Sequence, residues 1–371
     1  MTVSQPAQPN RAFKYFDLYG SMRSHKVMLE DMARMEAYHS AIFKNKSETI
    51  ADKVVLDVGT GTGVLAVWAA KAGAKRVYAV DASNAAELAR RLVQVSNVSD
   101  IVTVLHSKVE EVEIPESVDA IVSEWMGSLL LKESMFDSVA YARDKWLKPG
   151  GLLLPSHATI LLGLYAPTSD QDHSHFVRAK FEKEMAEWNE TVSNLQRIDV
   201  DYSSFTDELE QDLSDYFLRN AIRVNYLSQD NLASDPQRVL EFDCATVDPT
   251  ELVEFSKDFQ FTVSKHTEIK GFLGWFTTDF PNGTVLDTGP GEVYNHWGQQ
   301  LYPLQESFKV APGDRVEGTI TLRRNGEESR LNVVEFKYQV GRGTQQTALF
   351  NMGTVEHMYK GSKSVLFGHD L

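Results

Sequence analysis

The chain has 371 residues, with 37 Lys and Arg against 52 Asp and Glu, a formal net charge of −15 and one cysteine. This length predicts about two or three domains, and a lone cysteine excludes an intramolecular disulfide and a cysteine-based zinc site. The acidic balance disfavours nucleic-acid binding and favours cationic partners. No apolar run reaches the about 18 residues of a membrane span, and the polar N-terminus lacks a signal-peptide core, so we expect a soluble, intracellular protein.

Short apolar runs alternate with helical patterns through the first half of the chain. After a flexible tail over residues 1–13, a helical region extends to about Lys46. The predicted strands cover residues 54–58, 76–81, 101–105 and 118–122, and the predicted helices cover residues 64–72, 85–95 and 133–146. Strands and helices of these lengths form right-handed βαβ units. We therefore predict a doubly wound α/β domain with a parallel sheet, which together with the N-terminal helices occupies residues 14–155.

The pattern changes after Pro155. Two acidic helical stretches, about 176–189 and 207–222, precede strand-like runs that are separated by turns rich in Pro, Asn and Gly. The strand-like runs cover residues 239–242, 259–263, 271–276, 316–322 and 331–340. These features predict an antiparallel β domain over residues 156–371, with a helical insertion at about 176–222.

A glycine-rich loop follows the first predicted strand. Gly59 and Gly61 permit a tight turn, but Val64 stands where a dinucleotide fingerprint requires glycine. Asp57 would repel a pyrophosphate, and it suits a cationic ligand such as S-adenosylmethionine. Asp81 ends the second strand, where a carboxylate can accept both ribose hydroxyls. The loop therefore favours S-adenosylmethionine over NAD, and the alternative is a βα turn that binds no nucleotide.

Two carboxylates flank the loop after the fourth predicted strand. Glu124 leaves this strand at the ligand-binding edge, and Glu133 lies where the next helix is expected to begin. The loop between them could direct both carboxylates at one cation. The alternative is that Glu133 only interacts favourably with the helix dipole.

From Tyr15 onward the chain resembles the protein arginine methyltransferases, most closely those that make asymmetric dimethylarginine. The matching motifs are residues 15–19 (YFDLY), 54–63 (VVLDVGTGTG), 108–112 (KVEEV), 123–133 (SEWMGSLLLKE), 141–147 (YARDKWL) and 295–297 (NHW). The resemblance implies a Rossmann-like domain that binds S-adenosylmethionine, followed by a β-barrel-like domain with a helical arm. In the family such an arm docks on a second subunit, so we expect a homodimer. An apolar stripe on the second helical stretch would serve this docking, and it consists of Leu209, Leu213, Tyr216 and Phe217.

The resemblance also implies roles for individual residues. Glu124 and Glu133 would bind the substrate guanidinium. Asp31 and His296 would form a pair that orients the N-terminal helices and carries a proton away. The residues expected to bind the cofactor are Tyr19, His25, Met28, Arg34, Asp57, Gly59, Gly61, Asp81, Val109 and Glu110. Arg34 would hold the cofactor's carboxylate, which suits a guanidinium. The expected substrate-pocket residues are Met135 and Trp297, and no metal is required.

The chain departs from the family pattern at three positions. Ser128 stands where many relatives carry Tyr, Asn295 replaces Thr, and Asp81 replaces Glu. Asp81 keeps the charge at the ribose, whereas Ser128 and Asn295 bear on peptide preference and product. Met28 and Met135 are retained, and in the family they shape the pocket that admits a second methyl group.

These features predict an S-adenosylmethionine-dependent protein arginine N-methyltransferase that makes mono- and asymmetric dimethylarginine. Expected substrates are basic protein segments, such as Gly/Arg-rich segments or histone tails, in the cytoplasm or nucleus, without direct binding to nucleic acid or membrane. One alternative is a catalytically weak regulatory scaffold of the same fold. Another is a small-molecule methyltransferase that shares only the cofactor domain.

Overall fold

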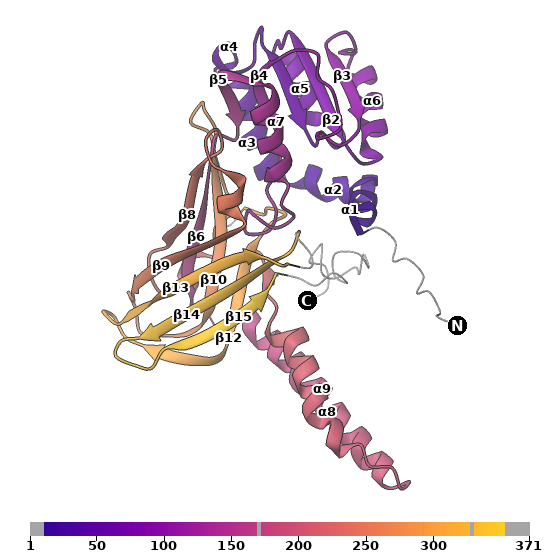
Figure 1. Cartoon of the computed structure of the whole chain (residues 1–371). Coiled ribbons are helices and arrows are strands. Elements are labelled where there is room, and N and C mark those ends of the chain that lie inside the picture. The colour runs from indigo at the N-terminus through magenta and orange to yellow at the C-terminus, as the bar shows by residue number, and fades with distance from the viewer. Residues whose placement is uncertain (1–10, 169–171, 292, 327–329, 353–371) are drawn as a thin grey trace.

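The computed structural model describes residues 11–168, 172–291, 293–326 and 330–352 (Figure 1). Residues 1–10 of the predicted tail lie outside these ranges, and residues 11–13 already belong to helix α1. An α/β domain stands above a β domain, and a helical arm projects from the β domain away from the α/β domain (Figure 1). The predicted fold class is therefore confirmed.

The N-terminal helical region is divided where polar side chains cap the helices. Its helices are α1 (Arg11–Tyr19), α2 (Met22–Glu30), α3 (Met32–Phe43) and α4 (Lys46–Thr49). Asp31 separates α2 from α3, because its Oδ1 accepts the backbone N–H of Arg34 at 3.0 Å and so caps α3. This cap places Asp31 in a buried corner between two helices.

A five-stranded parallel sheet has the order β3-β2-β1-β4-β5. Its strands are β1 (Val54–Val58), β2 (Arg76–Asp81), β3 (Val102–His106), β4 (Val118–Val122) and β5 (Leu147–Leu154), and its helices are α5 (Val64–Lys71), α6 (Ala85–Val95) and α7 (Phe136–Trp146). Every residue of β1 is buried, as expected for a central strand covered on both faces. The strand order reverses between β1 and β4, and ligands bind at such a switch point.

The β domain consists of two antiparallel sheets. One has the order β7-β12-β10-β6-β8 with β11 paired to β10, and the other has the order β15-β14-β13-β9. Their strands are β6 (His157–Tyr165), β7 (Ile222–Val224), β8 (Gln237–Asp243), β9 (Glu254–Thr262), β10 (Thr267–Asp279), β11 (Val285–Asp287), β12 (Gln299–Val310), β13 (Arg315–Arg324), β14 (Asn332–Val340) and β15 (Gln346–Asn351). Phe272 of β10 stacks on Phe336 of β14, with ring centroids 4.3 Å apart, so the two sheets share one core.

The two domains are also joined by side chains of α7. Arg143 donates hydrogen bonds to the carbonyl oxygens of Cys244 and Val247 in the β domain, at 2.9 and 2.8 Å. Asp137 accepts a two-pronged ion pair from Arg324, at the end of β13, with distances of 2.6 and 2.7 Å. These contacts fix α7 against the β domain.

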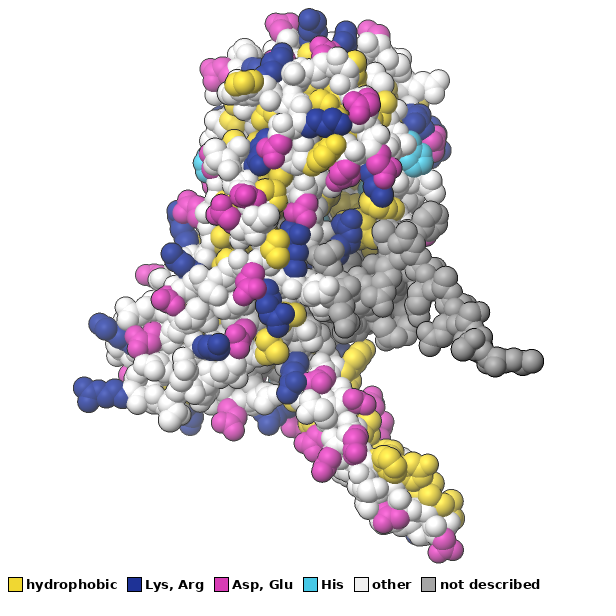
Figure 2. All heavy atoms as spheres, viewed as in Figure 1, with side chains coloured by type: hydrophobic (Ala, Val, Ile, Leu, Met, Phe, Trp, Pro, Cys, Tyr) yellow, Lys and Arg dark blue, Asp and Glu magenta, His cyan; other side chains and the backbone are white. Residues whose placement is uncertain are grey.

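The arm consists of α8 (His173–Gln196), α9 (Thr206–Leu213) and a π-helical turn (Ser214–Leu218). The second predicted helix is too long, because Ile222 already begins strand β7. Three members of the predicted apolar stripe are half-buried and one, Tyr216, is 48% exposed. Exposed apolar side chains also gather at the far end of the arm, in Ile198, Val200, Tyr202 and Phe205 (Figure 2). Among the described helices, none combines the length and apolar character that crossing a bilayer demands.

Candidate active site

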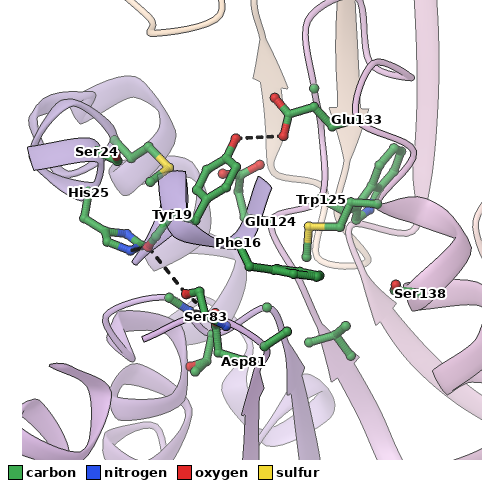
Figure 3. Close-up of a pocket in the computed structure, with 18 of the residues that line it drawn as sticks. Phe16, Tyr19, Ser24, His25, Asp81, Ser83, Glu124, Trp125, Glu133 and Ser138 are labelled. Atoms are coloured by element: carbon green, nitrogen blue, oxygen red, sulfur yellow. Dashed lines mark hydrogen bonds between the residues drawn. The ribbon is translucent and has the colours of Figure 1, made fainter. Parts of the chain in front are cut away.

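A cavity of about 240 Å³ lies at the carboxyl edge of the parallel sheet, between the N-terminal helices and the β domain. The predicted site residues that line it are Tyr19, His25, Met28, Arg34, Gly59, Gly61, Asp81, Val109, Glu110, Glu124, Glu133, Met135, His296 and Trp297. Asp31 and Asp57 lie behind this lining and are fully buried. Asp81 and Ser83 stand at one end of the cavity, and Glu133 stands at the other (Figure 3).

The glycine loop after β1 forms a cradle that side chains would fill. Gly59 and Gly61 have φ values of 71° and 56°, which favour glycine. A Cβ added to Gly59 would lie 2.2 Å from Cε of Met135, and one added to Gly61 would lie 2.9 Å from Cε1 of His25. Glycine at these positions therefore lets the backbone itself line the cavity, with the side chains of Met135 and His25 packed close to it.

Asp81 is oriented by the same loop. Its Oδ2 accepts the backbone N–H of Gly61 at 2.7 Å, and its Oδ1 accepts the backbone N–H of Ser83 at 2.7 Å. Glu110 also lines the cavity, and it accepts a hydrogen bond from the hydroxyl of Ser138 at 2.6 Å. These hydrogen bonds fix two carboxylates at the end of the cavity where the sequence predicts ribose and adenine.

Asp57 lies beneath the loop and has an incomplete set of hydrogen bonds. Thr60 donates to Oδ2 at 2.6 Å, but Oδ1 has no hydrogen-bond partner among the described residues. Burial raises the pKa of Asp57 to about 7, although the hydrogen bond from Thr60 opposes this shift. A buried acceptor of this kind favours a cationic group nearby.

Glu124 is held by Arg34. Nε of Arg34 donates to Oε2 of Glu124 at 2.9 Å, and both side chains are about one-tenth exposed, at 10% and 9%. Arg34 also donates to the carbonyl oxygen of Met28 at 3.1 Å. Oε1 of Glu124 is buried and has no hydrogen-bond partner in the described part of the chain. The structure thus gives Arg34 an ion pair with Glu124, whereas the resemblance predicts a contact with the cofactor.

Glu133 is held by two tyrosines of α1. The hydroxyl of Tyr15 donates to Oε2 at 2.9 Å, and the hydroxyl of Tyr19 donates to the same oxygen at 2.7 Å, the second bond being drawn in Figure 3. Burial, and then the charge of Glu133, raise the pKa of both tyrosines well above the ordinary value, so both remain donors. The resemblance implies a cofactor role for Tyr19 and no role for Tyr15. Their spacing of four residues on one helix was the available signal.

The loop that carries both glutamates has a strained backbone. Its non-glycine residues with positive φ are Leu129, Leu130, Glu133 and Ser134, at 46°, 70°, 78° and 55°. A Cβ on Gly127 would lie 1.8 Å from the carbonyl oxygen of Lys132, so the loop closes tightly on itself. For this reason α7 begins at Phe136, and the predicted helix start at Glu133 is wrong. Strained backbone of this kind is concentrated at functional sites.

His296 and Asp31 form the expected pair. Nδ1 of His296 lies 2.7 Å from Oδ2 of Asp31, and the backbone N–H of His296 donates to the same oxygen at 2.8 Å. Burial would raise the pKa of Asp31, but the hydrogen bonds from His296 and from the N–H of Arg34 outweigh it and lower that pKa. Arg223 donates to the carbonyl oxygen of His296 at 2.8 Å.

Asn295 and Trp297 anchor the loop on either side of His296. Nε1 of Trp297 donates to the carbonyl oxygen of Met126 at 2.7 Å, which ties this loop to the glutamate loop. Asn295 is buried, and its Oδ1 accepts the N–H of Gly298 at 2.8 Å. The side-chain amide of Asn295 therefore stabilises the turn of its own loop.

Sequence reasoning also missed two arginines that line the cavity, Arg223 and Arg330. Arg223 comes from β7 and Arg330 from the connection between β13 and β14. Neither belongs to a motif, and only the fold of the β domain brings them to the cavity.

Family models match most of the described chain. Residues 173–344 match the arginine methyltransferase oligomerization subdomain, and residues 55–151 match a methyltransferase domain. Protein arginine N-methyltransferase PRMT10 from Arabidopsis thaliana is 37% identical over 339 residues, which cover 88% of this chain and 87% of the relative. Protein arginine N-methyltransferase 6 from Danio rerio is 37% identical over 92% of this chain and 93% of its own length.

Solved structures show the same similarity. The crystal structure of Arabidopsis thaliana protein arginine methyltransferase 10, described as uniquely open, superposes with a TM-score of 0.86 at 35% identity and covers 90% of this chain and 99% of its own. The Trypanosoma brucei PRMT1 enzyme–prozyme complex with AdoHcy has a TM-score of 0.76 at 28% identity, with coverage of 91% and 100%.

Proposed function

Because this chain belongs to the protein arginine N-methyltransferase family and uses S-adenosylmethionine, we propose that it makes mono- and asymmetric dimethylarginine on basic protein segments. We further propose that it acts as a homodimer in the cytoplasm or nucleus, on Gly/Arg-rich segments or histone tails.

The cofactor half of the cavity fits S-adenosylmethionine. The glycine cradle leaves room for the ligand at the backbone, and Asp81 presents an oriented carboxylate for the ribose. The unpaired Oδ1 of Asp57 suits the cationic methionyl end. The cofactor supplies an electrophilic methyl group on its sulfonium.

The acceptor half carries the proposal. A free guanidinium has a pKa above about 12 and is a poor nucleophile because its lone pairs are delocalised. Glu124 and Glu133 line the same cavity, and the buried Oε1 of Glu124 lacks a donor that a guanidinium N–H would supply. Two carboxylates fixed by Arg34 and by the tyrosines of α1 can orient the acceptor and draw its positive charge away from the attacking nitrogen.

The route for the proton leads toward His296. This side chain lines the cavity, and its Nδ1 faces the buried carboxylate of Asp31. Asp31 orients the imidazole through Nδ1, so the pair can take up the proton that the guanidinium releases.

Met28 and Met135 support the asymmetric product, because both line the cavity and Met135 contacts the region of Gly59. The test is tandem mass spectrometry of a Gly/Arg-rich peptide after turnover. We expect monomethylarginine first, followed by dimethylarginine whose fragment ions lose dimethylamine. Symmetric dimethylarginine as the main product would contradict the proposal.

The far end of the arm supports the homodimer. Tyr202 and Phe205 are 43% and 52% exposed there, which is typical of a surface that another chain covers (Figure 2). The match of residues 173–344 to an oligomerization subdomain agrees with this assignment.

A further inference from the structure

Arg330 connects the β domain to the acceptor side of the cavity. It stands between β13 and β14, two residues before Asn332 begins β14, and it lines the cavity. Its own contacts reach both α1 and the glutamate loop, which are remote from it in the sequence.

The first contact is with α1. The guanidinium of Arg330 lies over the ring of Tyr15, 3.8 Å from the ring centroid. Beside it, Leu331 and Tyr15 are both buried in one small apolar cluster, against which Phe16 and Tyr19 pack. The β13–β14 connection therefore holds α1, which places the hydroxyl of Tyr15 at Glu133.

The second contact is with the backbone of Glu133. Nη1 of Arg330 donates to the carbonyl oxygen of Glu133 at 2.7 Å, and the N–H of Glu133 donates to the carbonyl oxygen of Arg330 at 2.7 Å. Glu133 has a φ of 78°, a conformation that persists only where surrounding contacts enforce it. Arg330 thus fixes Glu133 through its backbone and, by way of Tyr15, through its carboxylate.

We propose that Arg330 is a positioning residue for arginine methylation, which holds Glu133 and α1 in the single arrangement that receives the acceptor guanidinium. This assignment rests on the proposed role of Glu133. It predicts that the loss of Arg330 disturbs the acceptor half and spares the glycine cradle.

The test compares Arg330→Met, Arg330→Lys and the matched control Arg324→Met. Arg324 ends β13, next to the same connection, and also joins the two domains, through Asp137, but this contact does not involve Glu133. We expect Arg330→Met to lower kcat on an arginine peptide by at least about tenfold, because small displacements of a positioned group are costly. Binding of S-adenosylhomocysteine should change by less than about threefold, and Arg330→Lys should recover part of kcat because a cation over the ring is retained.

The control separates positioning from loss of stability. Arg324→Met should lower Tm at least as much as Arg330→Met does and leave kcat within about twofold. Equal losses of kcat in both variants, or a normal kcat in Arg330→Met, would overturn the proposal. Glu133→Gln is measured in parallel. If Glu133→Gln turns over normally, the proposed role of Glu133 fails, whereas an inactive Glu133→Gln beside a normal Arg330→Met refutes only the inference about Arg330.

A double-variant cycle tests the path through Tyr15. Tyr15→Phe keeps the ring beneath Arg330 and removes the hydroxyl that donates a hydrogen bond to Glu133. Residues that act as a unit give non-additive effects on kcat/KM. The double variant Tyr15→Phe/Arg330→Met should therefore lose less than the product of the two single losses. Fully multiplicative losses would exclude a shared path.

Discussion

The two ends of the cavity are built in different ways. At the proposed cofactor end, Asp81 is held by the N–H groups of Gly61 and Ser83, which lie in the loops after β1 and β2. At the proposed acceptor end, Glu133 is held by Tyr15, 118 residues away, and by Arg330 from the other domain. The cofactor end therefore depends on local chain geometry, and the acceptor end depends on the assembly of both domains.

Because the two ends are built differently, cofactor binding and acceptor binding should be separable by substitution. Strand ends and a glycine turn form whenever the parallel sheet forms. The acceptor end also requires α1, the strained glutamate loop and the β13–β14 connection to meet.

The largest expected effect comes from Glu124→Gln and Glu133→Gln. Each keeps the shape of the side chain and removes its charge, so kcat should fall by at least about 100-fold, the scale for one preorganised electrostatic contact. Isothermal titration with S-adenosylhomocysteine should give nearly unchanged affinity. Glu241→Gln, on the exposed side of β8, is the control and should keep full activity. Normal turnover in both active-site variants would remove the acceptor role of the loop.

The next effect comes from the backbone of the same loop. In Gly127→Ala, the new Cβ would lie 1.8 Å from a carbonyl oxygen, so the loop must move. We expect kcat/KM for the peptide to fall by about 10- to 100-fold, with cofactor affinity retained. Gly291→Ala, whose nearest neighbour would be 4.0 Å away, should behave as the unmodified chain does. A parallel loss of cofactor affinity would show that the two ends are not separable.

Asp57 tests the cofactor end through pH. Because burial raises its pKa to about 7, the carboxylate is mostly protonated at pH 6 and mostly ionised at pH 8. Affinity for S-adenosylmethionine should therefore rise by up to about tenfold between these pH values, and Asp57→Asn should bind weakly and without this slope. Equilibrium binding at pH 6, 7 and 8 measures both. An identical slope in Asp57→Asn would assign the titration to another group.

The same group affects stability with a defined sign. The folded-state pKa of Asp57 is above its unfolded value of about 3.9, so its contribution to stability is fully present below pH 4 and is lost as pH rises to about 7. The Tm of the ligand-free chain should decrease from pH 5 to pH 8, and this decrease should be smaller in Asp57→Asn than in the unmodified chain. Thermal unfolding at both pH values measures it. A decrease equal to that of the unmodified chain would contradict the assignment.

The smallest expected effect on binding comes from the arm. Replacing Tyr202 and Phe205 with Ser should produce monomers, because both side chains belong to the exposed apolar end of the arm. If assembly is coupled to the cofactor end, affinity for S-adenosylmethionine should fall by about fivefold. Light scattering and cofactor titration measure the two effects. Val285→Ser, with a side chain 53% exposed outside the arm, should leave the dimer intact.

The residues of the proposed cofactor end carry local signals in the sequence, and they line one cavity. Gly59, Gly61 and Asp81 are recognisable from strand ends and turn chemistry alone. Their positions at the two ends of one loop single out Glu124 and Glu133, but their role as acceptor residues came only from the family resemblance. The comparisons confirm the family. The residues that hold Glu124 and Glu133 in place were not predictable. The ion pair between Arg34 and Glu124, for example, joins residues 90 positions apart.

Two errors in the fold have similar causes. Strand β6 was missed because it is buried on both faces for most of its length and lacks the alternation that marks a half-buried strand. The second arm helix was extended too far because the apolar Ile222 continued the helical pattern, whereas its pairing with β12 decides its conformation. Both segments take their conformation from strands that are distant in the sequence, which hydrophobic periodicity does not identify.

The lone cysteine makes the chain suitable for site-specific labelling. Cys244 is 1% exposed, and burial raises its pKa, so it offers little thiolate to an alkylating dye. A cysteine introduced at an exposed position, such as Ile198 at the end of the arm, would react selectively without removal of the native thiol. A fluorophore there would report the contact between subunits in an otherwise unmodified chain.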